Sequence, residues 1–310
     1  MKIISVSAFL VVAAQADVLT PVQQFFGLGG QSVSEQYQDL QREYRGEEFS
    51  PFSDADSDLG VQEILAPTSS GAPVMIDLVT AGYFTDNAPA AFGPGLESSW
   101  LWYSRLSGAW RPHLVNGWHA DLGATQEFLR YDRTAALDYE NSTLRLGAVK
   151  SFADWDDVIF FARYEYQRLT SGSPTNGDYH AQRLRVGLQK VLWETSVQSI
   201  SAGVDTAYEI AAKPDTLERN SYGIELAHRY RLSPSLSTLA SWRADYYDFS
   251  SLGREDWSNK LGIELIWEIN PVTRANAGVF FDSNDSNAAF GANDQEAWTT
   301  GLGLGLTFDF

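Results

Sequence analysis

The sequence predicts an all-β protein: an up-and-down antiparallel transmembrane β-barrel of about twelve strands, with a short helical or irregular N-terminal extension. Three observations lead to this prediction. Apolar residues recur at every second position through residues 297–310. Many segments after Pro73 show the same two-residue period, which is the period of a β-strand. The connections between these segments are alternately short and long, as expected when antiparallel strands cross a membrane and return.

Residues 1–16 have the pattern of a secretory signal peptide. Lys2 gives a basic start, an apolar run follows, and Ala14-Gln15-Ala16 matches an A-x-A cleavage site, so Asp17 is the expected mature N-terminus. The apolar run is too short to span a membrane as a helix. The chain contains no cysteine, which excludes disulfides and a lipid-anchored cysteine.

Residues 17–72 form an acidic extension that differs from the rest of the chain, with ten acidic and two basic residues. Within it, residues 32–47 fit an amphipathic helix, and residues 66–73 read as a linker. We expect this extension to lie in the periplasm or to plug the lumen, with partial disorder as the alternative. The acidic run at 54–58 spaces oxygen ligands as a calcium loop does, but the following Gly and Glu are misplaced for an EF-hand. An acidic loop is the simpler interpretation, so we predict no metal and no cofactor.

Residues 73–310 form the predicted barrel domain. Its expected strands are 74–85, 98–112, 117–131, 139–152, 157–170, 180–193, 197–211, 218–232, 236–249, 257–269, 274–282 and 297–310. The long connections are expected near 86–97, 132–138, 171–179, 212–217, 250–256 and 283–296, and the remaining connections are short. An even number of strands with this alternation places both chain ends on the side of the short turns, which is the periplasm in such barrels.

The last predicted strand carries a specific resemblance. Trp298, Leu302, Leu304 and Phe308 share one face with the terminal Phe310, and the opposite face is small or polar. An edge strand of a soluble β-sandwich would be the alternative. The segment resembles the last strand of the bacterial outer-membrane β-barrel proteins, in a porin-like form. The resemblance implies that this strand closes the barrel and that Phe310 is an assembly signal read by the barrel-assembly machinery. It also implies the outer membrane of a Gram-negative bacterium, with lipid and lipopolysaccharide as partners.

Charged residues fall mainly on the face opposite the apolar one, which predicts a polar lumen of mixed sign, because charge on the lipid face is costly. Arg145, Arg163, Arg183 and Arg185 come from consecutive strands and are expected to form a basic track opposite an acidic arc of Glu225, Asp245 and Glu264. Arg168 and Lys190 break the pattern, but both lie near strand ends, where long side chains can reach the interface. The candidate lumen or selectivity residues are therefore Arg145, Arg163, Arg183, Arg185, Arg229, Arg243, Glu225, Asp245 and Glu264.

Three functions fit this pattern. The first is an outer-membrane channel for passive diffusion of small polar solutes, in which the charged lumen selects among them. The second is a closed structural or interaction barrel plugged by residues 17–72, in which the same charges brace the lumen.

The formal net charge of −18 argues against nucleic acid as a partner.

The third function is a hydrolase with its site at the outer rim. It is considered because twelve-strand barrels that resemble outer-membrane phospholipases and proteases exist. Asn116 and His119 have suggestive types but lie at an expected periplasmic turn. Asp178, His180 and Asp248 lie near the rim, where a polar loop explains them as well. An autotransporter is disfavoured because the upstream segment is short. We therefore predict that the protein is not an enzyme.

Overall fold

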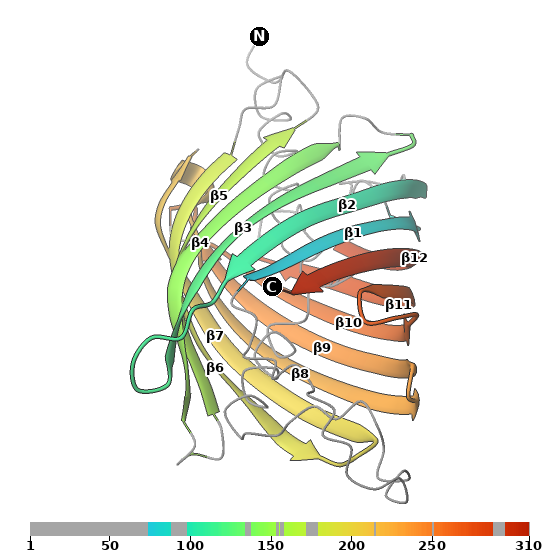
Figure 1. Cartoon of the computed structure of the whole chain (residues 1–310). Coiled ribbons are helices and arrows are strands. Elements are labelled where there is room, and N and C mark those ends of the chain that lie inside the picture. The colour runs from blue at the N-terminus through green and yellow to red at the C-terminus, as the bar shows by residue number, and fades with distance from the viewer. Residues whose placement is uncertain are drawn as a thin grey trace, which may run out of the picture.

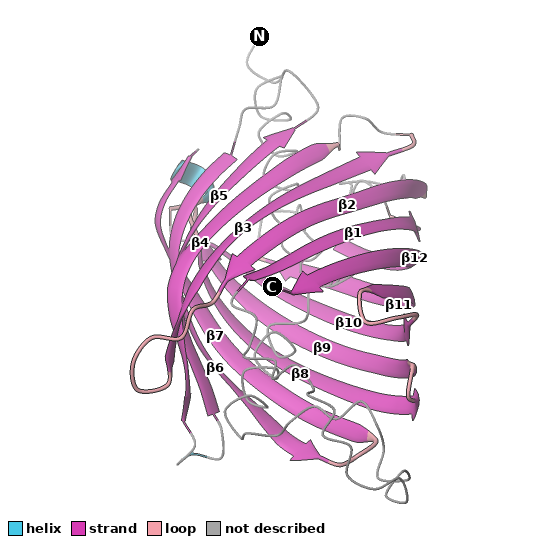
Figure 2. Cartoon of the chain, in the orientation of Figure 1, coloured by secondary structure: helices cyan, strands magenta, loops and turns pink. Residues whose placement is uncertain are grey.

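A computed structural model describes residues 74–87, 98–133, 138–152, 155, 158–171, 179–213, 215–249, 251–287 and 295–309. The predicted signal peptide, the acidic extension, the run at 54–58, Asp178 and Phe310 lie outside these residues. The described chain is a closed antiparallel barrel in which each strand pairs with its neighbours in sequence (Figure 1). Almost all of the described chain is strand, with one short 3-10 turn, η4 (Asp215–Leu217) (Figure 2). None of the described helical segments has the length and hydrophobicity to cross a membrane.

The strands follow one another along the chain without a crossover. Their bounds are β1 (Val74–Thr85), β2 (Ser99–Trp110), β3 (Trp118–Tyr131), β4 (Tyr139–Phe152), β5 (Val158–Ser171), β6 (Tyr179–Glu194), β7 (Gln198–Lys213), β8 (Asn220–Ser233), β9 (Leu236–Phe249), β10 (Arg254–Glu268), β11 (Thr273–Ser286) and β12 (Gln295–Asp309). The predicted fold class is confirmed.

The first and last strands close the barrel. β1 and β12 pair from Met75 opposite Asp309 to Thr85 opposite Thr299. The two strands therefore place Met75 and Asp309 at one end of the barrel, which is also the end of the short β8–β9 and β10–β11 turns. Closure leaves no unpaired strand edge among the described strands, and this is the condition for a sheet to sit in lipid.

β10 shows most clearly how the sequence period sets the two faces. From Arg254 to Leu265, every second residue is buried and the residues between are exposed. Lys260 and Glu264 point inward, whereas Leu261, Ile263 and Leu265 point outward. The apolar face predicted for β12 follows the same parity in the structure, and in β5, β7, β8 and β9 the charged residues alternate with mostly apolar outward residues as expected.

Two strands extend further than their sequences suggest. β10 begins at Arg254 rather than at residue 257, and β11 continues to Ser286 rather than ending at 282. Both extensions are polar because their inward residues pair with each other. Arg254 binds Asp256, with Arg254 Nη2 and Asp256 Oδ2 2.8 Å apart, and Ser286 Oγ donates to Asp256. A lumen-facing strand end therefore has the composition of a loop, which explains the error.

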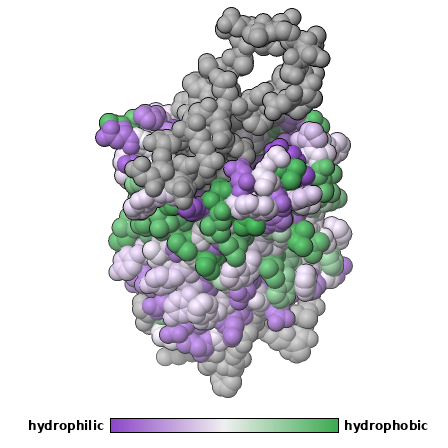
Figure 3. All heavy atoms as spheres, turned by 90° about the horizontal axis from the view of Figure 1, so that it is seen from below, coloured by the Kyte–Doolittle hydropathy of each residue, from purple (hydrophilic) through white to green (hydrophobic). Residues whose placement is uncertain are grey.

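The outer surface of the barrel carries a band of apolar side chains (Figure 3). Exposed aliphatic residues such as Leu144, Leu184 and Ile224 occupy the middle of their strands. Exposed tryptophans lie nearer both strand ends, for example Trp100 at one end and Trp267 at the other. An apolar band with aromatic residues at its margins is the surface that a bilayer requires of a barrel.

Candidate functional site: the charged lumen wall

All nine candidate lumen residues lie on strands, and their side chains are on the inward face. Arg145 is on β4, Arg163 on β5, Arg183 and Arg185 on β6, Glu225 and Arg229 on β8, Arg243 and Asp245 on β9, and Glu264 on β10. Successive side chains of a strand point to opposite faces, and the chain neighbours of these residues are mostly apolar and face outward. The two-residue period therefore suffices to place the nine residues on the inward face.

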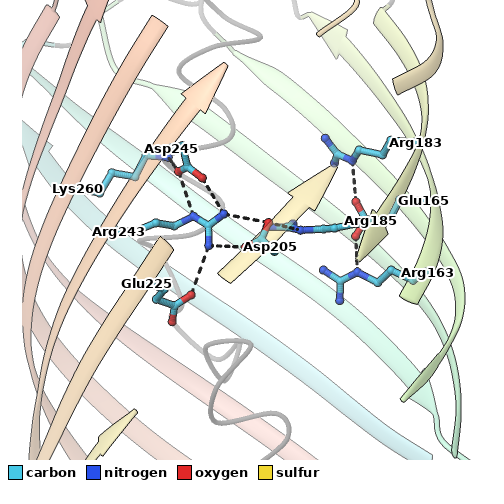
Figure 4. A network of polar contacts seen from close by, with 9 residues as sticks. All are labelled: Arg163, Glu165, Arg183, Arg185, Asp205, Glu225, Arg243, Asp245 and Lys260. Carbon is cyan, nitrogen blue, oxygen red and sulfur yellow. Dashed lines mark hydrogen bonds and ion pairs between the residues drawn. The ribbon is translucent and has the colours of Figure 1, made fainter. Parts of the chain in front are cut away.

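Glu165 of β5 joins two of the predicted arginines (Figure 4). Arg163 Nε lies 2.5 Å from Glu165 Oε1, and Arg183 Nε lies 2.6 Å from Glu165 Oε2. Arg163 and Glu165 are buried, and the Arg183 side chain is 14% exposed. The carboxylate is thus held between guanidinium groups from two neighbouring strands.

From Arg183, a row of hydrogen bonds between mostly neutral side chains runs along the wall to β2. Arg183 Nη2 donates to Gln167 Oε1, and Gln167 Nε2 donates to Asn141 Oδ1 at 3.0 Å. Asn141 Nδ2 then donates to Glu127 Oε2 at 2.6 Å, and the Tyr103 hydroxyl donates to Glu127 Oε1 at 2.7 Å. One hydrogen-bonded chain therefore links the inward faces of β2, β3, β4, β5 and β6.

Arg243 is the centre of a second network, on the other side of β6 (Figure 4). Its Nη2 lies 2.7 Å from Asp245 Oδ1, and its Nη1 lies 3.0 Å from Asp205 Oδ2 and 3.5 Å from Glu225 Oε2. Asp205 also binds Arg185, with Arg185 Nη2 2.7 Å from Asp205 Oδ1. One guanidinium therefore contacts carboxylates from β7, β8 and β9, and Arg185 supplies a further positive charge to Asp205.

Lys260 extends the second network onto β10. Its Nζ lies 3.4 Å from Asp245 Oδ2, and the side chain is fully buried. Asp282 of β11 lies directly opposite Lys260 in the strand register. Charged groups in a dry or confined environment are stable only when paired in this way.

The remaining candidates lie in smaller contacts. Arg145 Nε is 3.3 Å from Asp121 Oδ1, and Arg111 binds the same carboxylate. Glu264 accepts a hydrogen bond from Asn276, and Arg229 binds the half-exposed Glu268 at 3.0 Å.

The expected separation of a basic track from an acidic arc is wrong in its simple form. Acidic side chains lie between the four arginines of β4, β5 and β6, and Arg243 lies within the acidic arc. Charge alternates around the wall because a row of unpaired arginines would repel one another.

Inward glycines allow the large side chains to lie flat on the wall. Arg145 is opposite Gly123, Arg163 is opposite Gly147, and Tyr83 is opposite Gly301 in the strand register. A Cβ built on Gly123 would lie 2.6 Å from Arg145 Nε, and one built on Gly147 would lie 2.5 Å from Arg163 Cβ. These glycines, Asn141 and Gln167 were not predicted as site residues, although their inward parity was readable from the sequence.

The rim residues considered for hydrolysis are not brought together in the part of the chain that the structure describes. His119 is the second residue of β3 and faces His113 near the β2–β3 turn. His180 is on β6, where Tyr166 contacts its ring, and Asp248 is on β9, with β7 and β8 between them. No group of three or more His, Cys, Asp or Glu side chains suited to a metal occurs among the described residues.

The fold recurs in solved structures of outer-membrane proteins, whereas no protein-family model and no curated protein sequence matches the chain. An outer-membrane channel from Pseudomonas putida F1 aligns with a TM-score of 0.54 at 12% sequence identity, covering 76% of this chain and 96% of that chain. The NanC porin (TM-score 0.43, 10% identity, 74% and 98% covered) and the KdgM porin (0.40, 10%, 75% and 99%) are more distant. The chain thus shares the fold of the Pseudomonas putida channel, a closed antiparallel barrel.

Proposed function

We propose that the protein is a channel of the bacterial outer membrane through which small polar solutes diffuse passively. One observation carries the proposal: the barrel combines an apolar outer band with a lumen wall of buried, mutually paired charges. The outer band suits lipid, and the inner wall presents fixed dipoles and charges to anything that passes. The fold shared with an outer-membrane channel supports the same proposal.

The proposal includes the setting of the barrel. Both chain ends face the periplasm, lipid and lipopolysaccharide surround the barrel, and the barrel-assembly machinery inserts it. The protein is not an enzyme in this proposal, and its selectivity residues are the lumen-wall arginines and carboxylates.

Planar-bilayer recording of the refolded protein tests the channel. We expect an ohmic current whose reversal potential shifts towards cation selectivity when Arg163 and Arg185 are changed to Ala. Removal of positive charge from a low-dielectric wall lowers the barrier to cations and raises it for anions. Arg130→Gln is the matched control, because Arg130 pairs with Glu140 on the outward side of β3 and should leave the reversal potential unchanged.

A version without residues 17–72 separates the open channel from the plugged barrel. If this acidic segment sits in the lumen, its removal raises the conductance and weakens cation preference. An absence of current from both versions, in preparations shown to be folded, would contradict the channel and favour the structural or interaction barrel.

A further inference from the structure

We propose that Arg105 and Arg274 form a binding subsite for the carboxylate of small organic anions on the lumen wall beside the β1–β12 closure. The inference rests on the proposed channel function, which brings solutes to this wall, and it names the class of solute held there. Neither arginine belongs to the two ion-pair networks around Glu165 and Arg243.

The strand register places both arginines in one row across four strands. Arg105 of β2 is opposite Val79 of β1, Val79 is opposite Gly305 of β12, and Gly305 is opposite Arg274 of β11. Because neighbouring strands lie about 4.8 Å apart, the two arginine Cα atoms are about 14 Å apart. Two long side chains can converge across that distance on a solute between them.

The floor between the two arginines is small and apolar. Val79 and Gly305 separate them, and Ala81 is opposite Gly303 in the next inward row. Arg274 lies across the floor, since a Cβ built on Gly305 would be 3.2 Å from Arg274 Nε. The Arg274 side chain therefore extends over Gly305 along the row, in the direction of β1 and Arg105.

Both arginines keep buried N–H groups without an acceptor. Arg105 is 7% exposed, and its Nε and Nη2 are unsatisfied, as is Nη2 of Arg274. Neither arginine has an ion pair in the part of the chain that the structure describes. A buried guanidinium left in this state costs free energy, and a bound anion would remove that cost.

The carboxylates nearest to this row already receive hydrogen bonds from neutral groups. Glu127 is opposite Arg105 in the register but accepts from Tyr103 and Asn141. Asp77, in the adjacent row, accepts from the hydroxyls of Thr307 and Ser107. Arg105 also hydrogen-bonds with Tyr103, but Nε and Nη2 of Arg105 and Nη2 of Arg274 have no acceptor on the described wall and are left for an external one.

The chemistry of the row selects the class of anion. A guanidinium presents a planar fork of donors that matches a carboxylate bidentately. Towards the long connections the wall becomes aromatic, with Tyr103 buried beside Ala81 and the rings of Tyr83 and Phe280 6.4 Å apart. A carboxylate that carries an apolar or aromatic body fits both parts.

Titration calorimetry of the folded, full-length protein in detergent micelles tests the subsite, with benzoate as the probe and neutral benzamide as the comparison. We expect benzoate to bind and benzamide to bind far more weakly. Arg105→Gln and Arg274→Gln should each weaken benzoate binding about tenfold or more, because each removes a charged hydrogen-bond donor. Arg130→Gln removes the same charge from the outward side and should leave the affinity unchanged. Heat-modifiable gel migration verifies folding of each variant.

The calorimetric result tests the carboxylate subsite, and the bilayer recording tests the channel, so either proposal can be contradicted without the other. Equal affinity for benzoate and benzamide, or unchanged benzoate affinity in both arginine variants, would overturn the subsite even if the protein conducts. Selective benzoate binding that both substitutions weaken, in a protein that passes no current, would support the subsite and contradict the channel.

Discussion

At the scale of single residues, the lumen is organised by the pairing of buried charges. Arg243 is the clearest case, since its side chain is 9% exposed and contacts Asp205, Glu225 and Asp245. The guanidinium supplies enough donors for all three carboxylates because it carries five N–H groups in a fixed plane. Lys260 contributes a second positive charge beside Asp245.

Arg243→Gln is expected to destabilise the barrel by about 3–5 kcal/mol, because it leaves buried carboxylates without their partner. Urea unfolding of the protein in lipid vesicles, followed by tryptophan fluorescence, measures the change.

The control for Arg243→Gln is Arg229→Gln. The Arg229–Glu268 pair is partly exposed, so its loss should cost below about 1 kcal/mol. Equal destabilisation by the two substitutions would show that the network around Arg243 does not contribute more than an ordinary surface pair.

At the scale of strands, several inward glycines make room for a neighbour. Gly147 of β4 faces the main chain of β5, where a built Cβ would meet the carbonyl of Ala162 and Arg163 Cβ. Gly123 faces only the flexible end of Arg145. The two sites differ because main chain cannot move aside, whereas a guanidinium can.

Gly147→Ala is therefore expected to destabilise the barrel by about 1–3 kcal/mol through overpacking. Gly108→Ala is the matched control, because a Cβ there would meet nothing within 4 Å. Both effects are measured by the same urea unfolding, and a cost for Gly108→Ala equal to that of Gly147→Ala would contradict the steric explanation.

The resemblance of the last strand to outer-membrane barrel termini predicts a role for Phe310 in assembly. Deletion of Phe310 or Phe310→Asp is expected to reduce the amount of heat-modifiable, folded protein in the outer membrane severalfold. Phe308→Ala, two residues earlier on the apolar face, is the comparison for a loss of ordinary outward contact. Normal folded amounts after Phe310 deletion would remove the assembly role.

Most of the barrel is predictable from sequence because strand period and turn composition are local signals. The strand β4 (Tyr139–Phe152) agrees with the expected bounds at both ends. The starts of β10 and β12 were less accurate because polar inward residues and loop residues look alike. The pairing of Arg163 and Arg183 with one glutamate could not be predicted from the sequence. A sequence gives the face on which a residue lies but not the direction of its side chain along the wall.

At the scale of the whole molecule, the barrel has two unlike ends. The β6–β7 and β8–β9 connections are tight turns on the side of Met75 and Asp309. The connections after β1, β5 and β11 are longer and lie at the other end. This asymmetry supports an orientation in which the longer connections face the cell exterior.

Cysteine labelling tests that orientation, since the natural chain contains no cysteine. Cysteines placed at Thr175 and at Asn293 are expected to react with a membrane-impermeant maleimide on intact cells. One placed at Pro234 should react only after the outer membrane is opened. Labelling of Pro234→Cys alone on intact cells would invert the proposed orientation.

The contacts of Arg243 also constrain how this sequence can diverge. Replacement of Arg243 would leave carboxylates on β7, β8 and β9 without this partner. A lineage that loses Arg243 would therefore have to replace Asp205, Glu225 or Asp245 by neutral residues soon afterwards. Residues bound together in this way should change as a group among descendants, whereas the outward leucines can drift singly. We therefore expect the inner wall to be inherited as a unit, and the lipid-facing surface residue by residue.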